Sequence, residues 1–174
     1  MPEAEGRKMP ERCRPLRIWR SLDPERKLRA AAAFWKSDLV KPPEIELAVT
    51  SLATALHFRP QSIRTAPLAR RAAWLAGYHG ISDHLAAPIL YAYHLTHQVP
   101  MMVRFLDSIG VEHEEGRIKE EAKSPEPKAV EEGVDALLKE FDRKDVITYL
   151  ETLVSQDEKT WAGVAAVLEA RLST

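Results

Sequence analysis

The sequence predicts an all-α protein, a multi-helix bundle or layered helical domain of about seven or eight helices with no significant sheet. Three observations favour this fold class. Apolar residues recur at helical spacing along most of the chain, and strand-like alternation is missing. Prolines and small polar residues stand where helices would begin, and glycines where they would end. The chain has 174 residues, of which 45% are apolar, so it can bury a core in one medium domain or two small ones.

The first group of helices is expected between residues 21 and 110, as an N-terminal helical layer. Asp23 is suited to cap the first of them, with Pro24 at the first helical position. Gly110 is a natural end for the last. Each segment carries an apolar stripe at helical spacing, and together the predicted helices cover residues 22–38, 43–58, 64–80, 82–98 and 99–110.

The helix predicted over residues 82–98 is unusual because its apolar side chains spread all round it. A helix that is apolar on every side is buried on every side, so we expect it to be central to the domain. Pro88 should kink this helix or mark its beginning. Asp83 and His94 are about 16 Å apart along a straight helix, so they cannot share one site.

His94 and His97 are neighbours at i, i+3 and form the candidate polar site of the sequence. Three interpretations compete. Both residues fall near the predicted helix end, where a histidine can bond to terminal carbonyls and interact favourably with the helix dipole. They could also begin a metal site with a further ligand from elsewhere, or bind a polar ligand or act in acid–base chemistry. The motifs GxGxxG, GxxxxGK[ST], CxxC and HExxH are missing, so no metal or cofactor is predicted and a non-enzymatic role is favoured.

Residues 111–128 are predicted to be a charged linker. Of the 17 residues from 112 to 128, ten are charged and two are prolines. A segment of this composition can bury little surface. The stretch "VEHEEGRI" could form a small hairpin. Residues 129–174 then predict a C-terminal three-helix unit. This segment is acidic, and we expect it to dock on the basic first part of the chain.

The first 20 residues are predicted to form a basic and partly disordered arm. Residues 1–80 contain 15 Lys and Arg against eight Asp and Glu, whereas residues 81–174 contain ten against 18. A basic half can contact an anionic partner, so nucleic-acid binding is an alternative function, although the near-neutral net charge of −1 speaks against it. The residues that would make these contacts are Arg14, Arg17, Arg20, Arg70 and Arg71.

The N-terminus lacks the apolar region of a secretory signal, and the chain has no apolar run of the ~20 residues that span a bilayer. The single cysteine, Cys13, cannot form an internal disulfide. These features favour a cytoplasmic protein with no membrane association.

The function we expect is therefore a protein–protein interaction or adaptor module, because layered helices offer grooves for partner helices. The alternatives are the nucleic-acid-associated protein described above and an enzyme or metal-binding protein that uses His94 and His97.

Overall fold

The all-α fold class is confirmed. The computed structural model describes residues 8–119 and 121–172, which contain ten α-helices, one short 3₁₀ helix and a two-stranded sheet. The helix count exceeds the expected seven or eight because the structure has two short helices that were not predicted, one before the first predicted helix and one between two predicted helices. These are α1 (Pro15–Ser21) and α4 (Pro60–Thr65), of seven and six residues. Segments of two turns are too short to show helical periodicity.

The chain divides into two compact units. Unit 1 contains the described residues of the ranges 1–18 and 100–174, and unit 2 is Trp19–Val99. The first boundary falls inside α1 and the second at the start of α7 (Val99–Ser108). The predicted division into residues 21–110, 111–128 and 129–174, and the docking of the last segment on the first part, stay predictions.

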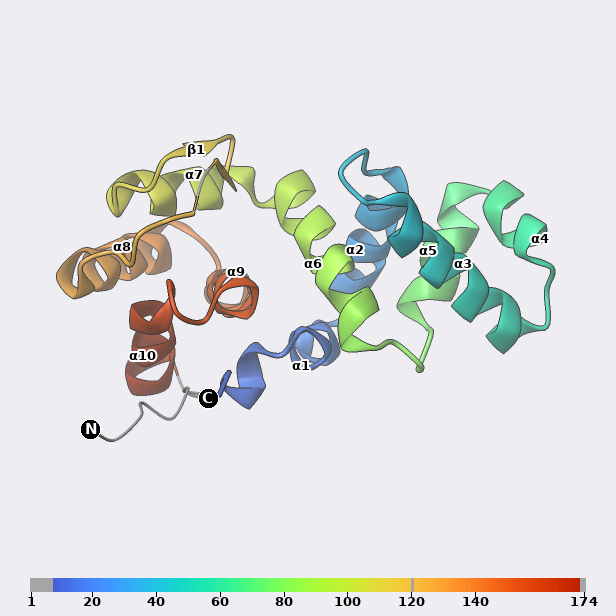
Figure 1. The fold of residues 1–174 in the computed structure, drawn as a ribbon, viewed down its shortest axis with the longest axis horizontal. Coiled ribbons are helices and arrows are strands. Elements are labelled where there is room, and N and C mark those ends of the chain that lie inside the picture. The colour runs from blue at the N-terminus through green and yellow to red at the C-terminus, as the bar shows by residue number, and fades with distance from the viewer. Residues whose placement is uncertain (1–7, 120, 173–174) are drawn as a thin grey trace. The chain divides into compact units, whose positions relative to one another are not determined.

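Unit 2 is built around α2 (Pro24–Lys36), which packs against α5 (Leu68–Ala76) and α6 (Asp83–His97) (Figure 1). Helix α3 (Pro42–Leu56) contacts α4, α5 and α6. Asp23 caps α2 as the sequence predicts, because its side chain accepts a hydrogen bond of 2.8 Å from the Arg26 backbone. The buried face of α2 consists mainly of alanines, which let the neighbouring helices approach closely: Ala30, Ala31, Ala33 and Phe34.

The predicted burial of the histidine helix on every side is only partly observed, because Asp83, His84 and Ala87 are exposed. Eight of the 15 residues of α6 are buried. The helix begins at Asp83, so a start at Pro88 is wrong, and Pro88 lies buried inside it. At that position Pro88 deprives the first helical turn of one hydrogen bond. Burial of the apolar side chains around the helix offsets this loss.

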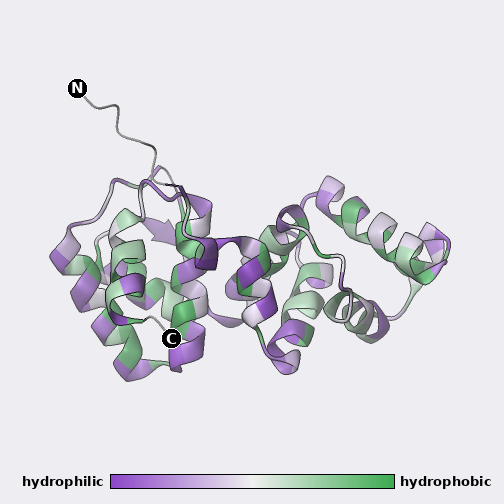
Figure 2. Ribbon diagram, turned by 90° about the horizontal axis from the view of Figure 1, so that it is seen from below, coloured by the Kyte–Doolittle hydropathy of each residue, from purple (hydrophilic) through white to green (hydrophobic). Residues whose placement is uncertain are grey.

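Unit 1 has α9 (Arg143–Gln156) as its most buried helix. An unbroken run from Thr148 to Val154 is buried, and α9 contacts α8 (Pro127–Glu140) and α10 (Ala162–Arg171). Phe105 of α7 packs edge-on against Tyr149, with ring centroids 6.0 Å apart. Figure 2 shows that the helices carry both hydrophobic and hydrophilic residues, as amphipathic helices do.

Residues predicted as linker form a hairpin at their start. Strands β1 (His113–Glu114) and β2 (Arg117–Ile118) pair antiparallel across a two-residue turn. Both turn residues have positive φ, 50° at Glu115 and 87° at Gly116, which is the geometry of a type I′ turn. Gly116 is buried against Met102, and a Cβ there would come 2.9 Å from the Met102 Cβ. The hairpin thus packs against α7 through Gly116 and Met102.

Residues 8–18 lie within unit 1, although the sequence predicts a partly disordered arm over residues 1–20. Residues 1–7 are outside the described part of the chain. A 3₁₀ helix, η1 (Glu11–Cys13), contacts α9, and Cys13 is completely buried. Burial is the main reason that the pKa of the Cys13 thiol rises to about 12, so the thiol stays protonated at neutral pH.

Arg12 attaches this segment to two helices. Its Nε lies 3.1 Å from the Glu151 carboxylate of α9. Its Nη1 and Nη2 donate to the carbonyls of Leu168 and Leu172, each at 3.1 Å. Both carbonyls lie at the C-terminal end of α10. The Leu168 carbonyl also accepts a hydrogen bond of 3.1 Å from the Leu172 amide, and Arg12 adds a side-chain donor to each carbonyl. Burial raises the pKa of Glu151 and the Arg12 hydrogen bond opposes that rise, so the carboxylate depends on Arg12 to remain charged.

We expect the variant Arg12→Ala to lose about 3 kcal/mol of unfolding free energy, because it leaves the buried Glu151 carboxylate without its cation. The double variant Arg12→Met/Glu151→Leu, in which neither charge remains, should recover most of this loss. Urea unfolding monitored by circular dichroism measures both values. Cys13 is the only thiol of the chain, so its reaction with Ellman's reagent reports release of the segment. Unchanged stability and an unreactive thiol in Arg12→Ala would show that Arg12 does not hold the segment.

Candidate functional site

The structure does not bring His94 and His97 together into one polar site. His94 is buried, at 2% exposure, whereas His97 is exposed. The Tyr93 ring lies against both, with centroid distances of 5.3 Å to His94 and 5.5 Å to His97. The Tyr93 hydroxyl accepts a hydrogen bond of 3.3 Å from Gln98 Nε2. Both imidazoles thus lie beside the Tyr93 ring, but one is in the protein interior and the other is at the surface.

Burial lowers the pKa of His94 from 6.5 to about 3, so this imidazole is neutral at physiological pH. The pKa of His97 is also lowered, first by partial burial and then by the positive charges of Arg29 and Lys36. Two cations near His97 disfavour metal binding there. Within the described residues, no group of three His, Cys, Asp or Glu side chains is placed to hold a metal ion. The metal and acid–base interpretations of this pair stay predictions.

The five arginines predicted to contact nucleic acid belong to both units. Arg14 and Arg17 are exposed in unit 1, and Arg20 and Arg70 are exposed in unit 2. Arg71 is occupied within unit 2, since its Nε donates to the Ala66 carbonyl at 3.0 Å and its guanidinium lies 5.3 Å from the Trp35 ring centre. Nucleic-acid binding by this set stays a prediction. In the described part of the chain, no helix has both the length and the apolar character needed to cross a bilayer.

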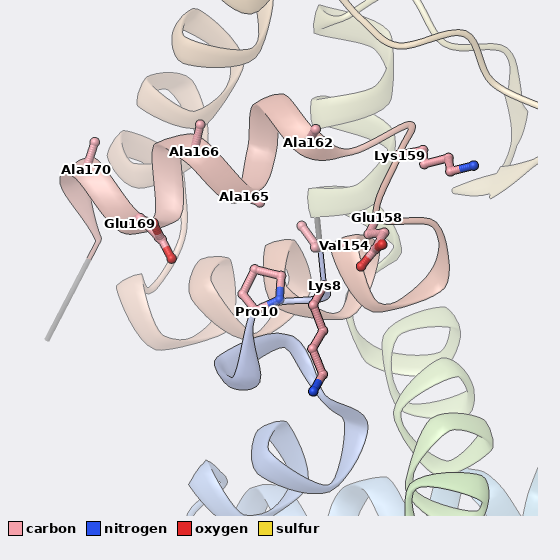
Figure 3. Close-up of a pocket in the computed structure, with 10 residues that line it drawn as sticks. All are labelled: Lys8, Pro10, Val154, Glu158, Lys159, Ala162, Ala165, Ala166, Glu169 and Ala170. Atoms are coloured by element: carbon pink, nitrogen blue, oxygen red, sulfur yellow. The ribbon is translucent and has the colours of Figure 1, made fainter. Parts of the chain in front are cut away.

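The surface of α10 offers a further candidate site. A groove of about 850 Å³ runs along this helix and is closed on its other side by Lys8 and Pro10 of the N-terminal segment and by Val154 of α9 (Figure 3). Ala165 and Glu169 face this segment from α10. The rim carries charges of both signs, from Lys8, Glu158, Lys159 and Glu169.

A second groove, of about 380 Å³, borders the same helix and is lined in part by Pro127 and Glu131 of α8. Ala162, Ala166 and Ala170 line both grooves. They are spaced at i, i+4 and i+8, so they form a low ridge about 12 Å long. We call this ridge and its two flanking grooves the alanine ridge surface. Its three alanines are candidate site residues that sequence reasoning missed.

The four-residue spacing of the three alanines is visible in the sequence, but it is a weak indication of an exposed ridge. Three alanines at four-residue spacing usually belong to a buried helix face. In α10 the opposite face is buried instead, through Val164, Val167 and Leu168. Only the packing of α10 against α8 and α9 shows that the alanines remain accessible.

The buried His94 should make unit 2 sensitive to acid. In the unfolded chain His94 takes up a proton near pH 6.5, and in the folded chain only near pH 3. The contribution of neutral His94 to the unfolding free energy is therefore fully present above pH 6.5 and is lost as the pH falls toward 3. We expect proton uptake by His94 in the unfolded chain to lower the unfolding free energy by about 3 kcal/mol between pH 7 and pH 4.5. Urea unfolding at the two pH values should show that His94→Gln removes this difference and that His84→Gln, at an exposed position of α6, retains it. Equal acid sensitivity of both variants would contradict a buried, neutral His94.

Known proteins offer no functional assignment for this arrangement. No protein-family profile, curated protein sequence or solved structure matches the chain. A function can therefore be inferred only from the residues and surfaces of the chain itself.

Proposed function

We propose that this protein is an interaction module that binds an amphipathic α-helix of a partner protein on the alanine ridge surface. The observation that carries this proposal is the ridge of Ala162, Ala166 and Ala170 with a groove on each side. Helices pack by fitting the side-chain ridges of one helix into the grooves of the other. Alanine at the crossing point lets two helix axes approach closely, and large partner side chains can then fill both grooves.

The geometry specifies the partner. A ridge of about 12 Å corresponds to two turns of helix, so the partner needs apolar anchors at i, i+3 or i+4, and i+7. Leucine, methionine or phenylalanine would occupy the groove that contains Val154 and Pro10. Rim charges of both signs, including Lys159 and Glu169, favour a partner helix with mixed charges. Such binding should depend only weakly on salt, because attractive and repulsive charge pairs partly cancel.

The exposed position Ala166 provides the test, because it lies at the centre of the ridge. A display library of helical peptides, randomised only at the i, i+3, i+4 and i+7 positions, is selected on the full chain. We expect enrichment of large apolar residues at those positions. Ala166→Glu should weaken binding of the selected peptides at least about tenfold in fluorescence anisotropy, because it places a charge on the contact surface.

Ala87→Glu is the matched control, since it introduces the same residue at an exposed alanine of another helix. Thermal unfolding checks that both variants remain folded. Failure to enrich any peptide, or equal binding to Ala166→Glu and the wild type, would contradict the proposal.

A further inference from the structure

Unit 2 contains an apolar pocket, which is separate from the alanine ridge surface of unit 1. It has a volume of about 410 Å³ and lies between α3 and α5. Leu52 and Leu56 of α3 form one wall, and Trp74 of α5 forms the other. Tyr78 lies across the backbone of Gly80, where a Cβ would collide with the tyrosine ring. Glycine at position 80 therefore allows Tyr78 to close one end of the pocket.

Phe58 extends this pocket onto the surface. It is 46% exposed, which is a large exposure for a phenylalanine, and its ring meets that of Trp74 edge-on at 5.5 Å. The end of α3 fixes its position, because His57 adopts left-handed backbone geometry with φ 55° and the Phe58 amide bonds to the Ala53 carbonyl at 3.0 Å. Exposed aromatic rings held in place beside an apolar pocket are typical of the central contacts of protein interfaces.

The chain segment that lines this pocket carries charges of one sign. Residues 47–82 contain no aspartate or glutamate, and their charged residues are Arg59, Arg64, Arg70 and Arg71. Arg64 is paired with Glu46 at 2.6 Å, and Arg71 is bound to the Ala66 carbonyl. The other two arginines, Arg59 and Arg70, are exposed. Arg59 follows Phe58 directly, and Arg70 lies one helical turn before Trp74 on the same side of α5.

We propose that this pocket is a docking site for an acidic peptide segment that inserts a large apolar side chain beside Trp74. The apolar anchor would fill the space between α3 and α5, and its flanking carboxylates would pair with Arg59 and Arg70. Two exposed arginines can neutralise few phosphates, whereas they can pair with the carboxylates that flank an apolar anchor. These features favour a peptide over a nucleic acid.

The test uses the full chain and an array of labelled dodecapeptides in three composition classes. One class combines Phe, Leu or Trp with Asp and Glu, the second replaces the acids by lysine, and the third replaces the apolar residues by serine. We expect the first class to bind at least about tenfold more tightly than the others. Raising the salt concentration should weaken this binding, because exposed charges are screened.

Two variants connect binding to the pocket. Phe58→Ser and the double variant Arg59→Glu/Arg70→Glu should each weaken the acidic peptides about tenfold or more. All three positions are exposed, so both variants should retain the wild-type melting temperature. Lys41→Glu, a charge reversal at another exposed cation of unit 2, should leave binding unchanged. Ala166→Glu should also leave it unchanged, which separates this site from the alanine ridge surface.

Several outcomes would overturn the proposal. These are equal binding of the acidic and lysine classes, no binding by any class, and binding that survives Phe58→Ser. Tighter binding of a single-stranded oligonucleotide, lost in the arginine double variant, would identify the site as a nucleic-acid contact. Self-association in sedimentation that disappears in Phe58→Ser would identify a second copy of the chain as the occupant.

Discussion

The partly buried contact of Arg12 with Glu151 and the end of α10 joins three elements of unit 1. One guanidinium neutralises a carboxylate inside α9 and donates to two carbonyls at the C-terminal end of α10. It thereby joins residues that are 139 positions apart in the chain. A planar guanidinium with five donors can make these three bonds at once, which a lysine ammonium could not do with the same geometry.

The groove that contains Val154 and Pro10 depends on this contact. Lys8 and Pro10, which close the groove opposite α10, directly precede the residues that Arg12 anchors. Burial of Cys13 in the same segment adds an apolar contact and keeps the thiol protonated. The alanine ridge surface is therefore shaped by a polar interaction that is mostly removed from solvent, where such bonds are strong and where loss of one partner is costly.

The two candidate surfaces differ in the physical basis of recognition. The alanine ridge surface has small side chains and charges of both signs, so shape complementarity would determine its partner. The α3–α5 pocket has the exposed Phe58 ring beside Trp74 and two exposed arginines, so apolar burial and charge would act together. The histidine pair lacks comparable support, since burial of α6 separates His94 from solvent and keeps it neutral.

Local patterns in the sequence determined the fold class, the capping of α2 by Asp23 and the burial of α6, because periodicity and capping depend only on neighbouring residues. They did not show that Glu11–Cys13 packs on α9, or which alanines of α10 stay exposed. The first feature depends on residues more than a hundred positions apart, and the second on how α10 packs against α8 and α9. The pairing of Arg12 with Glu151 has no local signal. Only the tertiary structure decided them, because long-range packing selects which amphipathic faces are covered and which remain accessible to a partner.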